Sequence, residues 1–145
     1  MVNMEVSVVI NRPLGEVFTK LTDLENNERW RSGTIQAEKT SAGDVGVGTT
    51  YRMVNSAFGR RMEGEAEVTE FEPNRRFVTK NRSGVPIETE RIFEPVEGGT
   101  RVTFTVKAEL AGFFQLAEPL VAGIGKRRLE SDVADLKDLL EAGAL

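Results

Sequence analysis

Arg91 lies in a strand-like segment, 87–94, whose alternating pattern predicts an unusual position for an arginine. Alternate residues of a strand face the same way, so one register buries three glutamates and the other buries Ile87, Thr89, Arg91 and Phe93. Burying three unpaired carboxylates costs more free energy than burying one guanidinium, which favours the second register. An inward guanidinium needs a carboxylate, a phosphate or several carbonyls as partners. We therefore expect Arg91 to pair with a glutamate near the edge of the interior or to anchor a ligand, unless the strand register slips.

Neighbouring strand-like segments add side chains to the same predicted inner face. In the segment 61–68, glutamates at positions 63, 65 and 67 must face water, which turns the alternate residues inward. Tyr51 can present its hydroxyl to a ligand or hydrogen-bond to backbone at the rim. Gly64 can mark a β-bulge or leave room for a ligand. The predicted inner set is Tyr51, Met53 and Asn55 in one strand, Met62 and Gly64 in the next, and Phe104 in a later one.

Aromatic and apolar residues outside the strands form a second group of candidates. Trp30 is expected to pack and to close one end of the sheet, with stacking on a ligand as the alternative. A cluster at the start of the last helical segment is expected to belong to the core, or else to gate the mouth of a cavity. It comprises Phe113, Phe114, Leu116 and Leu120, and we take Phe113, Leu120 and the following Ile124 as candidates for ligand contact.

The residue types that most often carry out catalysis are missing from the chain. It contains no histidine and no cysteine, which excludes a histidine base, a Ser/His/Asp triad, a thiol nucleophile and disulfides. The glutamates fall on outward strand positions, so no metal site and no cofactor is predicted. The glycine-rich stretch 43–48 lacks the lysine and the helix of a phosphate-binding loop. Any catalysis would rely on Tyr, Arg, Asn and substrate positioning, and whether the chain is an enzyme stays open.

Length and composition fit one globular domain spanning residues 1–145. Of these residues 39% are hydrophobic and 29% are charged, as in ordinary folded proteins. The net charge of −4 gives no field that would attract nucleic acid, and the basic run 126–128 is expected to be a solvated helix face. No apolar run is long enough for stable membrane insertion, and the N-terminus lacks a signal-peptide pattern. We expect a cytoplasmic protein, and we make no prediction of its oligomeric state.

The order of the elements predicts an α+β fold. An alternating segment, 4–10, indicates a first strand, and Pro13 and Asp23 are placed to open two short helices that end near Trp30. Between about 32 and 110, strand-length runs separated by turn residues indicate six further strands in an antiparallel meander. The segment from about 113 to 142 reads as a helix with two differently oriented apolar stripes, which predicts a kink or a curve near Pro119.

This order and several short motifs resemble the START-like superfamily, also called SRPBCC, and within it the polyketide cyclase/dehydrase and lipid-transport group. The resemblance spans nearly the whole chain and rests on the motifs at 10–13, 17–18, 21–23, 30, 46–49, 68–73, 93–95 and 98–103. It implies a helix-grip fold, in which a seven-stranded curved antiparallel sheet encloses a cavity with a long C-terminal helix. Such families include lipid carriers, hormone binders, aromatic-polyketide cyclases, chaperone co-activators and quinone-binding proteins, so the resemblance implies no single reaction.

Three functions are compatible with these observations. The leading expectation is a protein that binds a small apolar or amphipathic ligand, such as a lipid, polyketide or aromatic compound, between the sheet and the last helix. Tyr51, Asn55 and Arg91 would orient its polar end, and an acidic headgroup would account for an inward arginine. One alternative is a cyclase or dehydratase in which Tyr51 or Arg91 stabilises an enolate. The other is an interaction module that exposes the apolar cluster near residue 113 to a protein partner.

Overall fold

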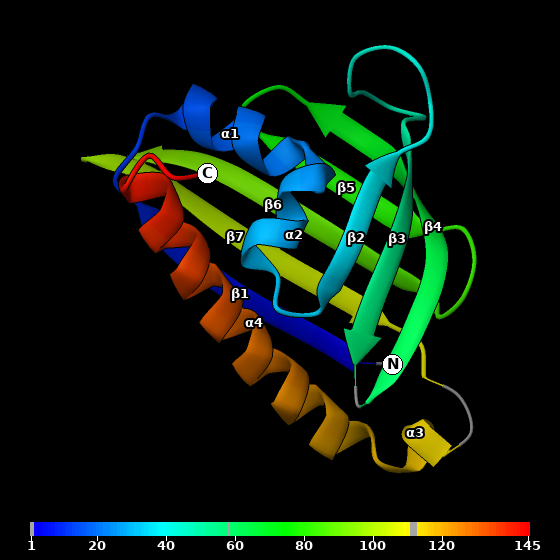
Figure 1. Ribbon diagram of the computed structural model, residues 1–145. Coiled ribbons are helices and arrows are strands. Elements are labelled where there is room, and N and C mark those ends of the chain that lie inside the picture. Colours follow the sequence, from blue (N-terminus) through cyan, green and yellow to red (C-terminus); the bar gives the residue numbers. More distant parts are fainter. Residues whose placement is uncertain (1, 58, 111–112) are drawn as a thin grey trace.

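The computed structural model describes residues 2–57, 59–110 and 113–145, with the side chains of residues 113 and 114 outside the described part. Within these ranges seven strands form one antiparallel sheet in the order β1-β7-β6-β5-β4-β3-β2 (Figure 1). This confirms the predicted meander and its number of strands. The strands are β1 (Val2–Ile10), β2 (Thr34–Lys39), β3 (Thr50–Ala57), β4 (Arg60–Glu72), β5 (Arg76–Asn81), β6 (Ile87–Val96) and β7 (Gly99–Ala108).

The helices lie on one face of the sheet (Figure 1). Three short elements follow β1, namely α1 (Leu14–Thr22), the 3-10 helix η1 (Leu24–Asn26) and α2 (Asn27–Trp30). The C-terminal part contains α3 (Phe113–Leu116) and the long helix α4 (Glu118–Glu141). Helix α4 packs mainly on β1, whereas α1 covers β6 and β7 and α2 contacts β2 and α4. The sheet is therefore gripped along one edge by α4 and covered at one end by the short helices.

The two short helical segments begin where the sequence predicts. Pro13 precedes α1 as its N-cap residue, where its missing N–H leaves no helical donor unpaired. Asp23 precedes η1, and its Oδ1 accepts a hydrogen bond from the backbone N–H of Glu25 at 3.2 Å. The chain turns twice within a few residues, which brings Trp30 over the inner face of the sheet.

The predicted interruption of the last helix is a break between α3 and α4. Ala117 separates the two helices, and Pro119 lies in the first turn of α4, where proline is tolerated. The C-terminal half of α4 buries its apolar stripe on the sheet, whereas Leu120 and Ile124 in the N-terminal half are exposed. The buried stripe consists of Leu129, Val133, Leu136 and Leu140.

Strand parity follows the prediction in the strands that line the interior. In β7, Val102 and Phe104 are fully buried, whereas Arg101 and Lys107 are exposed. At the start of this strand the backbone passes so close to β1 that a Cβ on Gly99 would lie 2.1 Å from the carbonyl oxygen of Ile10. Only glycine allows this approach.

Candidate functional site

Arg91 is buried on the inner face of β6, as the register argument predicts. Its side chain is 5% exposed, and Nη1 donates hydrogen bonds to Thr79 Oγ1 and to the carbonyl oxygen of Thr89, both at 3.2 Å. The guanidinium carbon lies 5.0 Å from the centre of the Phe77 ring, a cation–π distance. Within the described residues no carboxylate pairs with Arg91. The predicted pairing with a glutamate is therefore absent from this part of the chain.

The electrostatic surroundings of Arg91 disfavour its charge. Burial lowers the pKa of Arg91 to about 9, and the positive charge of Arg31 acts in the same direction. The nearby Tyr51 acts in the opposite direction and favours the charged form. A buried cation whose only acceptors are neutral oxygens attracts an anion strongly, because the anion removes part of the desolvation cost.

Tyr51 is the second polar group on this inner face. It is fully buried in β3, and its hydroxyl has no hydrogen-bond partner among the described residues. Burial raises the pKa of Tyr51 to about 12, and the negative charges of Asp23 and Glu25 add to this rise. The charge of Arg91 opposes it, as does the backbone N–H of Leu24, which is near the hydroxyl without meeting the geometry of a hydrogen bond. Tyr51 therefore stays protonated at neutral pH and can donate a hydrogen bond.

Trp30 contributes a third polar atom that the sequence argument did not single out. Its ring is 5% exposed and packs against Phe104 with the ring centres 5.8 Å apart, which agrees with the predicted packing role. The indole Nε1–H, however, is buried without a partner in the described residues. Buried indole N–H groups usually find an acceptor. The sequence signal was present, since Trp30 is the only tryptophan in the chain.

These three groups occupy one region of the interior. In the sheet register Arg91 lies directly opposite Phe104 on β7 and Phe77 on β5, and Trp30 packs on Phe104 from the helical side. Tyr51 and Arg91 are near enough to affect each other's charge. The structure thus brings together residues from β3, β6 and α2, and we call Arg91, Tyr51 and Trp30 the donor cluster.

Helix α4 is tied to the loop after α2 by a buried acid. Asp132 is 2% exposed, accepts a hydrogen bond from the backbone N–H of Ser32 at 3.2 Å and lies 3.5 Å from Nε of Arg31. Arg128, one turn earlier, donates to the hydroxyl of Ser32 at 3.0 Å. Asp132 was not among the sequence candidates, because one acid on a helix gives no pattern that separates it from a solvated one. It holds Arg31 beside Trp30, with the guanidinium 5.5 Å from the ring centre.

The interior around the donor cluster is filled rather than hollow. The concave face is packed with large side chains, and within the described residues the pocket on this face measures only about 50 Å³. This is far below the size of ordinary small-molecule sites. Rings and aliphatic chains from both the strands and the helices fill much of the curve of the sheet, and the larger ligand cavity expected from the sequence stays a prediction. The filling side chains include Phe18, Trp30, Tyr51, Phe77, Phe93, Phe104, Leu129 and Leu136.

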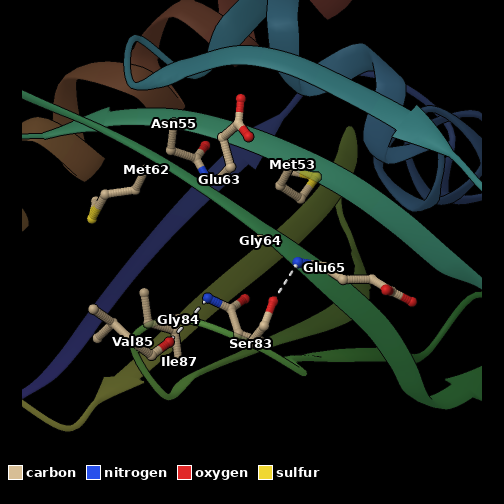
Figure 2. A pocket seen from close by; sticks show the side chains of 11 residues that line it. Met53, Asn55, Met62, Glu63, Gly64, Glu65, Ser83, Gly84, Val85 and Ile87 are labelled. Carbon is tan, nitrogen blue, oxygen red and sulfur yellow. Dashed lines mark hydrogen bonds between the residues drawn. The ribbon is translucent and has the colours of Figure 1, made fainter.

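The small pocket lies where β3 and β4 meet the segment 81–87, which joins β5 to β6 (Figure 2). Four of the predicted ligand residues line it, namely Met53, Asn55, Met62 and Gly64, together with Ile87. Met62 was predicted to point inward but is 38% exposed, because β4 extends beyond the covering helices at this end. Gly64 allows a close approach, since a Cβ there would lie 3.1 Å from the carbonyl oxygen of Ser83.

A second depression of about 360 Å³ is wide open to solvent. It adjoins the small pocket at Gly64 and is lined mainly by polar and charged residues, including Arg52, Glu63 and Glu65. The glutamates face water, as predicted. Because it is so open, it would leave most of an apolar molecule in contact with water.

The remaining predicted residues are placed elsewhere. Phe93 packs edge-on against Phe18 of α1, with ring centres 4.9 Å apart, and belongs to the core. Leu120 and Ile124 were predicted to line a cavity, but they are 66% and 44% exposed, because the N-terminal half of α4 does not bury its apolar side chains on the sheet. The side chain of Phe113 lies outside the described residues. Thr89 takes part through its carbonyl oxygen, which accepts from Arg91.

Neither a metal site nor a membrane span emerges from the described part of the chain. No group of three or more acidic side chains is arranged there to hold a metal ion. No helix there is both long and apolar enough to cross a membrane.

Comparisons with known proteins give a family and a fold. The sequence model of a family described as polyketide cyclase/dehydrase and lipid transport matches residues 1–141. No curated protein matches the chain significantly in sequence. Among solved structures, the protein TTHA0849 from Thermus thermophilus is 24% identical with a TM-score of 0.85, and the match covers 99% of each chain.

Two further solved structures carry functional names. The Zhui aromatase/cyclase from a Streptomyces species is 14% identical with a TM-score of 0.73, covering 94% of this chain and 91% of that one. The Aha1 dimer from Colwellia psychrerythraea is 22% identical with a TM-score of 0.68, covering 99% and 98%. At such low identity these likenesses show a shared helix-grip-like fold and transfer neither a reaction nor a partner.

Proposed function

Because the chain belongs to the polyketide cyclase/dehydrase and lipid transport family, we propose that it binds a small apolar or amphipathic molecule on the inner face of its sheet. In this proposal the whole chain forms a single ligand-binding domain, and it works in the cytoplasm. The ligand enters at the pocket lined by Met53, Met62 and Ile87 and extends toward the donor cluster. The observation that carries the proposal is this pocket, in which four apolar side chains lie beside polar ones. The apolar side chains are Met53, Met62, Val85 and Ile87, and the polar ones are Asn55, Glu63, Glu65, Asn81 and Ser83.

Exposed apolar residues near the pocket support the proposal that a ligand enters the protein there. Leu116 in α3 and Leu120 in α4 are 87% and 66% exposed, and Figure 1 shows α3 and the beginning of α4 at the same end of the molecule as the end of β3 and the start of β4. Met53 and Met62 are unbranched and adapt their shape readily. Since the pocket of about 50 Å³ holds only water-sized groups, a ligand must displace side chains to enter. Binding is therefore expected to be accompanied by a local opening near α3.

Native mass spectrometry of the freshly purified protein, followed by extraction, tests whether a compound is retained. A titration with 1-decanol tests the site directly, because the fluorescence of the single tryptophan, Trp30, reports on the inner face. Met53→Arg places a charge in the pocket and should abolish the response, whereas Val47→Arg, at an exposed site outside the pocket, should leave it unchanged. A wild-type protein that carries no compound and does not respond to 1-decanol would overturn the proposal.

A catalytic role is a second candidate, favoured by the donor cluster itself. Tyr51 and Arg91 are both hydrogen-bond donors at neutral pH and could stabilise a developing enolate during cyclisation or dehydration. Turnover of a poly-β-ketone that is lost in Tyr51→Phe, with binding of 1-decanol retained, would support this role. Turnover that survives this substitution would remove Tyr51 from the mechanism.

A docking role is favoured by a different observation, the exposure of Leu116, Leu120 and Ile124 on α3 and α4. Sedimentation of the protein over a range of concentrations tests whether this surface binds a second copy. Self-association that is abolished by Leu116→Glu, in a protein to which 1-decanol does not bind, would replace the ligand role by a docking role. A monomer at all concentrations would leave the surface as part of the mouth.

A further inference from the structure

We propose that the ligand is an amphipathic acid whose carboxylate is held by Arg91, Tyr51 and Trp30, while its apolar part extends to the pocket near Ile87. This inference rests on the proposed binding function and narrows the ligand to one chemical class. Charge balance, the orphaned donors and the length of the inner face each support it.

Charge balance leaves Arg91 without a counter-ion. The acids that act on Tyr51 or lie beside Arg31 are engaged by other groups: Asp132 binds Ser32 and Arg31, and the Oδ1 of Asp23 accepts from the backbone N–H of Glu25. Glu25 in turn accepts from the backbone N–H of Lys39. Arg31 therefore has a buried carboxylate beside it, that of Asp132, whereas the buried Arg91 has none among the described residues. An anion bound at Arg91 would restore neutrality in the interior.

The free edge of the guanidinium matches a carboxylate. Both hydrogen bonds of Arg91 come from Nη1, so Nε and Nη2 have no acceptor among the described residues. A carboxylate can accept from two N–H groups of an arginine at once, which makes this pairing both strong and directional. The neighbouring Phe77 and Phe104 supply apolar walls that strengthen the interaction by excluding water.

The unpaired indole N–H of Trp30 and the unpaired hydroxyl of Tyr51 also need a hydrogen-bond acceptor. The indole Nε1–H of Trp30 can only donate, and the protonated hydroxyl of Tyr51 can donate as well. An ammonium or another donor group would leave the indole N–H unsatisfied, whereas carboxylate oxygens would accept from both. The donor cluster thus selects against cationic ligands and favours acids over alcohols of the same length.

The inner face sets the length of the apolar part. Arg91 and Ile87 are four residues apart in β6 and face the same way, so they are separated by roughly 13 Å at about 3.3 Å per residue. An extended alkyl chain advances about 1.3 Å per carbon, because its bonds of about 1.5 Å zigzag, so roughly ten carbons span this distance. Ile87 lines the small pocket, where the far end of such a chain would emerge. A monocarboxylic acid of about this length, or a fused-ring acid of similar extent, fits both ends.

Isothermal titration calorimetry with decanoate, 1-decanol and decylammonium, all below their micelle concentrations, tests this assignment. Decanoate should bind wild-type protein about tenfold or more tightly than 1-decanol, since a charge-assisted bond adds to the same apolar contacts. Decylammonium should bind most weakly. Arg91→Gln should remove the preference for decanoate over 1-decanol, and Tyr51→Phe and Trp30→Phe should each reduce the preference about threefold to tenfold. Arg101→Gln, on the outer face of β7, should behave as wild type.

The outcomes separate this inference from the proposed function. If 1-decanol binds and decanoate binds no more tightly, the acid site is wrong and the binding function stands. If none of the three probes binds, the binding function itself fails. Should Arg91→Gln fail to fold, as judged by circular dichroism, the conservative Tyr51→Phe and Trp30→Phe variants decide, and an unchanged preference in both overturns the acid site.

Discussion

Replacing Tyr51 with phenylalanine should stabilise the ligand-free protein, which is the opposite of what most core substitutions do. The Tyr51 hydroxyl is fully buried and has no partner among the described residues, so folding removes it from water without replacing its hydrogen bonds. An unsatisfied buried hydroxyl costs about 1–3 kcal/mol, and phenylalanine keeps the ring and its packing. Tyr51→Phe should therefore raise the free energy of unfolding by about 1 kcal/mol or more.

Urea denaturation followed by the fluorescence of Trp30 measures this change, since no other tryptophan contributes. A gain of about 1 kcal/mol corresponds to a rise in Tm of about 2–4 °C for a chain near this length. Thr100→Val is the matched control, because the hydroxyl of Thr100 is also buried but donates to the carbonyl oxygen of Arg12 at 2.9 Å. The control should lose about 0.5–1.5 kcal/mol.

The two substitutions should thus shift stability in opposite directions. A Tyr51→Phe protein that is less stable than wild type by about 1 kcal/mol would show that the hydroxyl is hydrogen-bonded in solution. In that case the hydroxyl would not be held free for a ligand. A gain in stability together with a weaker preference for decanoate would show instead that the hydroxyl is retained for binding.

Three further predictions concern the site and its support. The pKa of Tyr51 is raised to about 12, so the tyrosinate absorbance of this single tyrosine should appear near pH 12 in the folded protein and near pH 10 after denaturation. The stability that this pKa difference contributes is complete below pH 10 and is lost as the pH rises toward 12. A titration of the folded protein near pH 10 would contradict the burial of Tyr51. Gly99→Ala should destabilise the protein by about 3 kcal/mol or more in urea denaturation, because the added Cβ would collide with the carbonyl oxygen of Ile10. The control Gly46→Ala should change stability by less than about 1 kcal/mol, because a Cβ at that position would have no neighbouring atom within contact distance. Asp132→Ala should cost about 1–3 kcal/mol and increase hydrogen exchange in α4, since it removes the acceptor of the Ser32 N–H; unchanged exchange there would show that α4 is held by apolar packing alone.

Several parts of the fold could be predicted because they depend on local patterns. The alternation of charged and apolar residues in 61–68 and 87–94 determines which side of each strand can be buried, and it placed Arg91 inside correctly. Pro13 and Asp23 mark helix starts through their own backbone and side-chain chemistry. The expectation that Leu116 and Leu120 belong to the core was wrong, because helical periodicity shows that a stripe exists and leaves open which surface, if any, covers it.

Local patterns are therefore enough to predict the order of the elements, the antiparallel sheet and the inward arginine, since strand parity and turn chemistry act over a few residues. The surroundings of that arginine depend on how the distant elements pack. Arg91 lacks a counter-ion and the N–H of Trp30 lacks an acceptor because of how distant segments pack around them. In the same way, the buried hydrogen bond between Asp132 and Ser32 joins residues that are 100 positions apart in the chain. Whether a buried polar group has a partner depends on which elements pack together, and no local pattern encodes that.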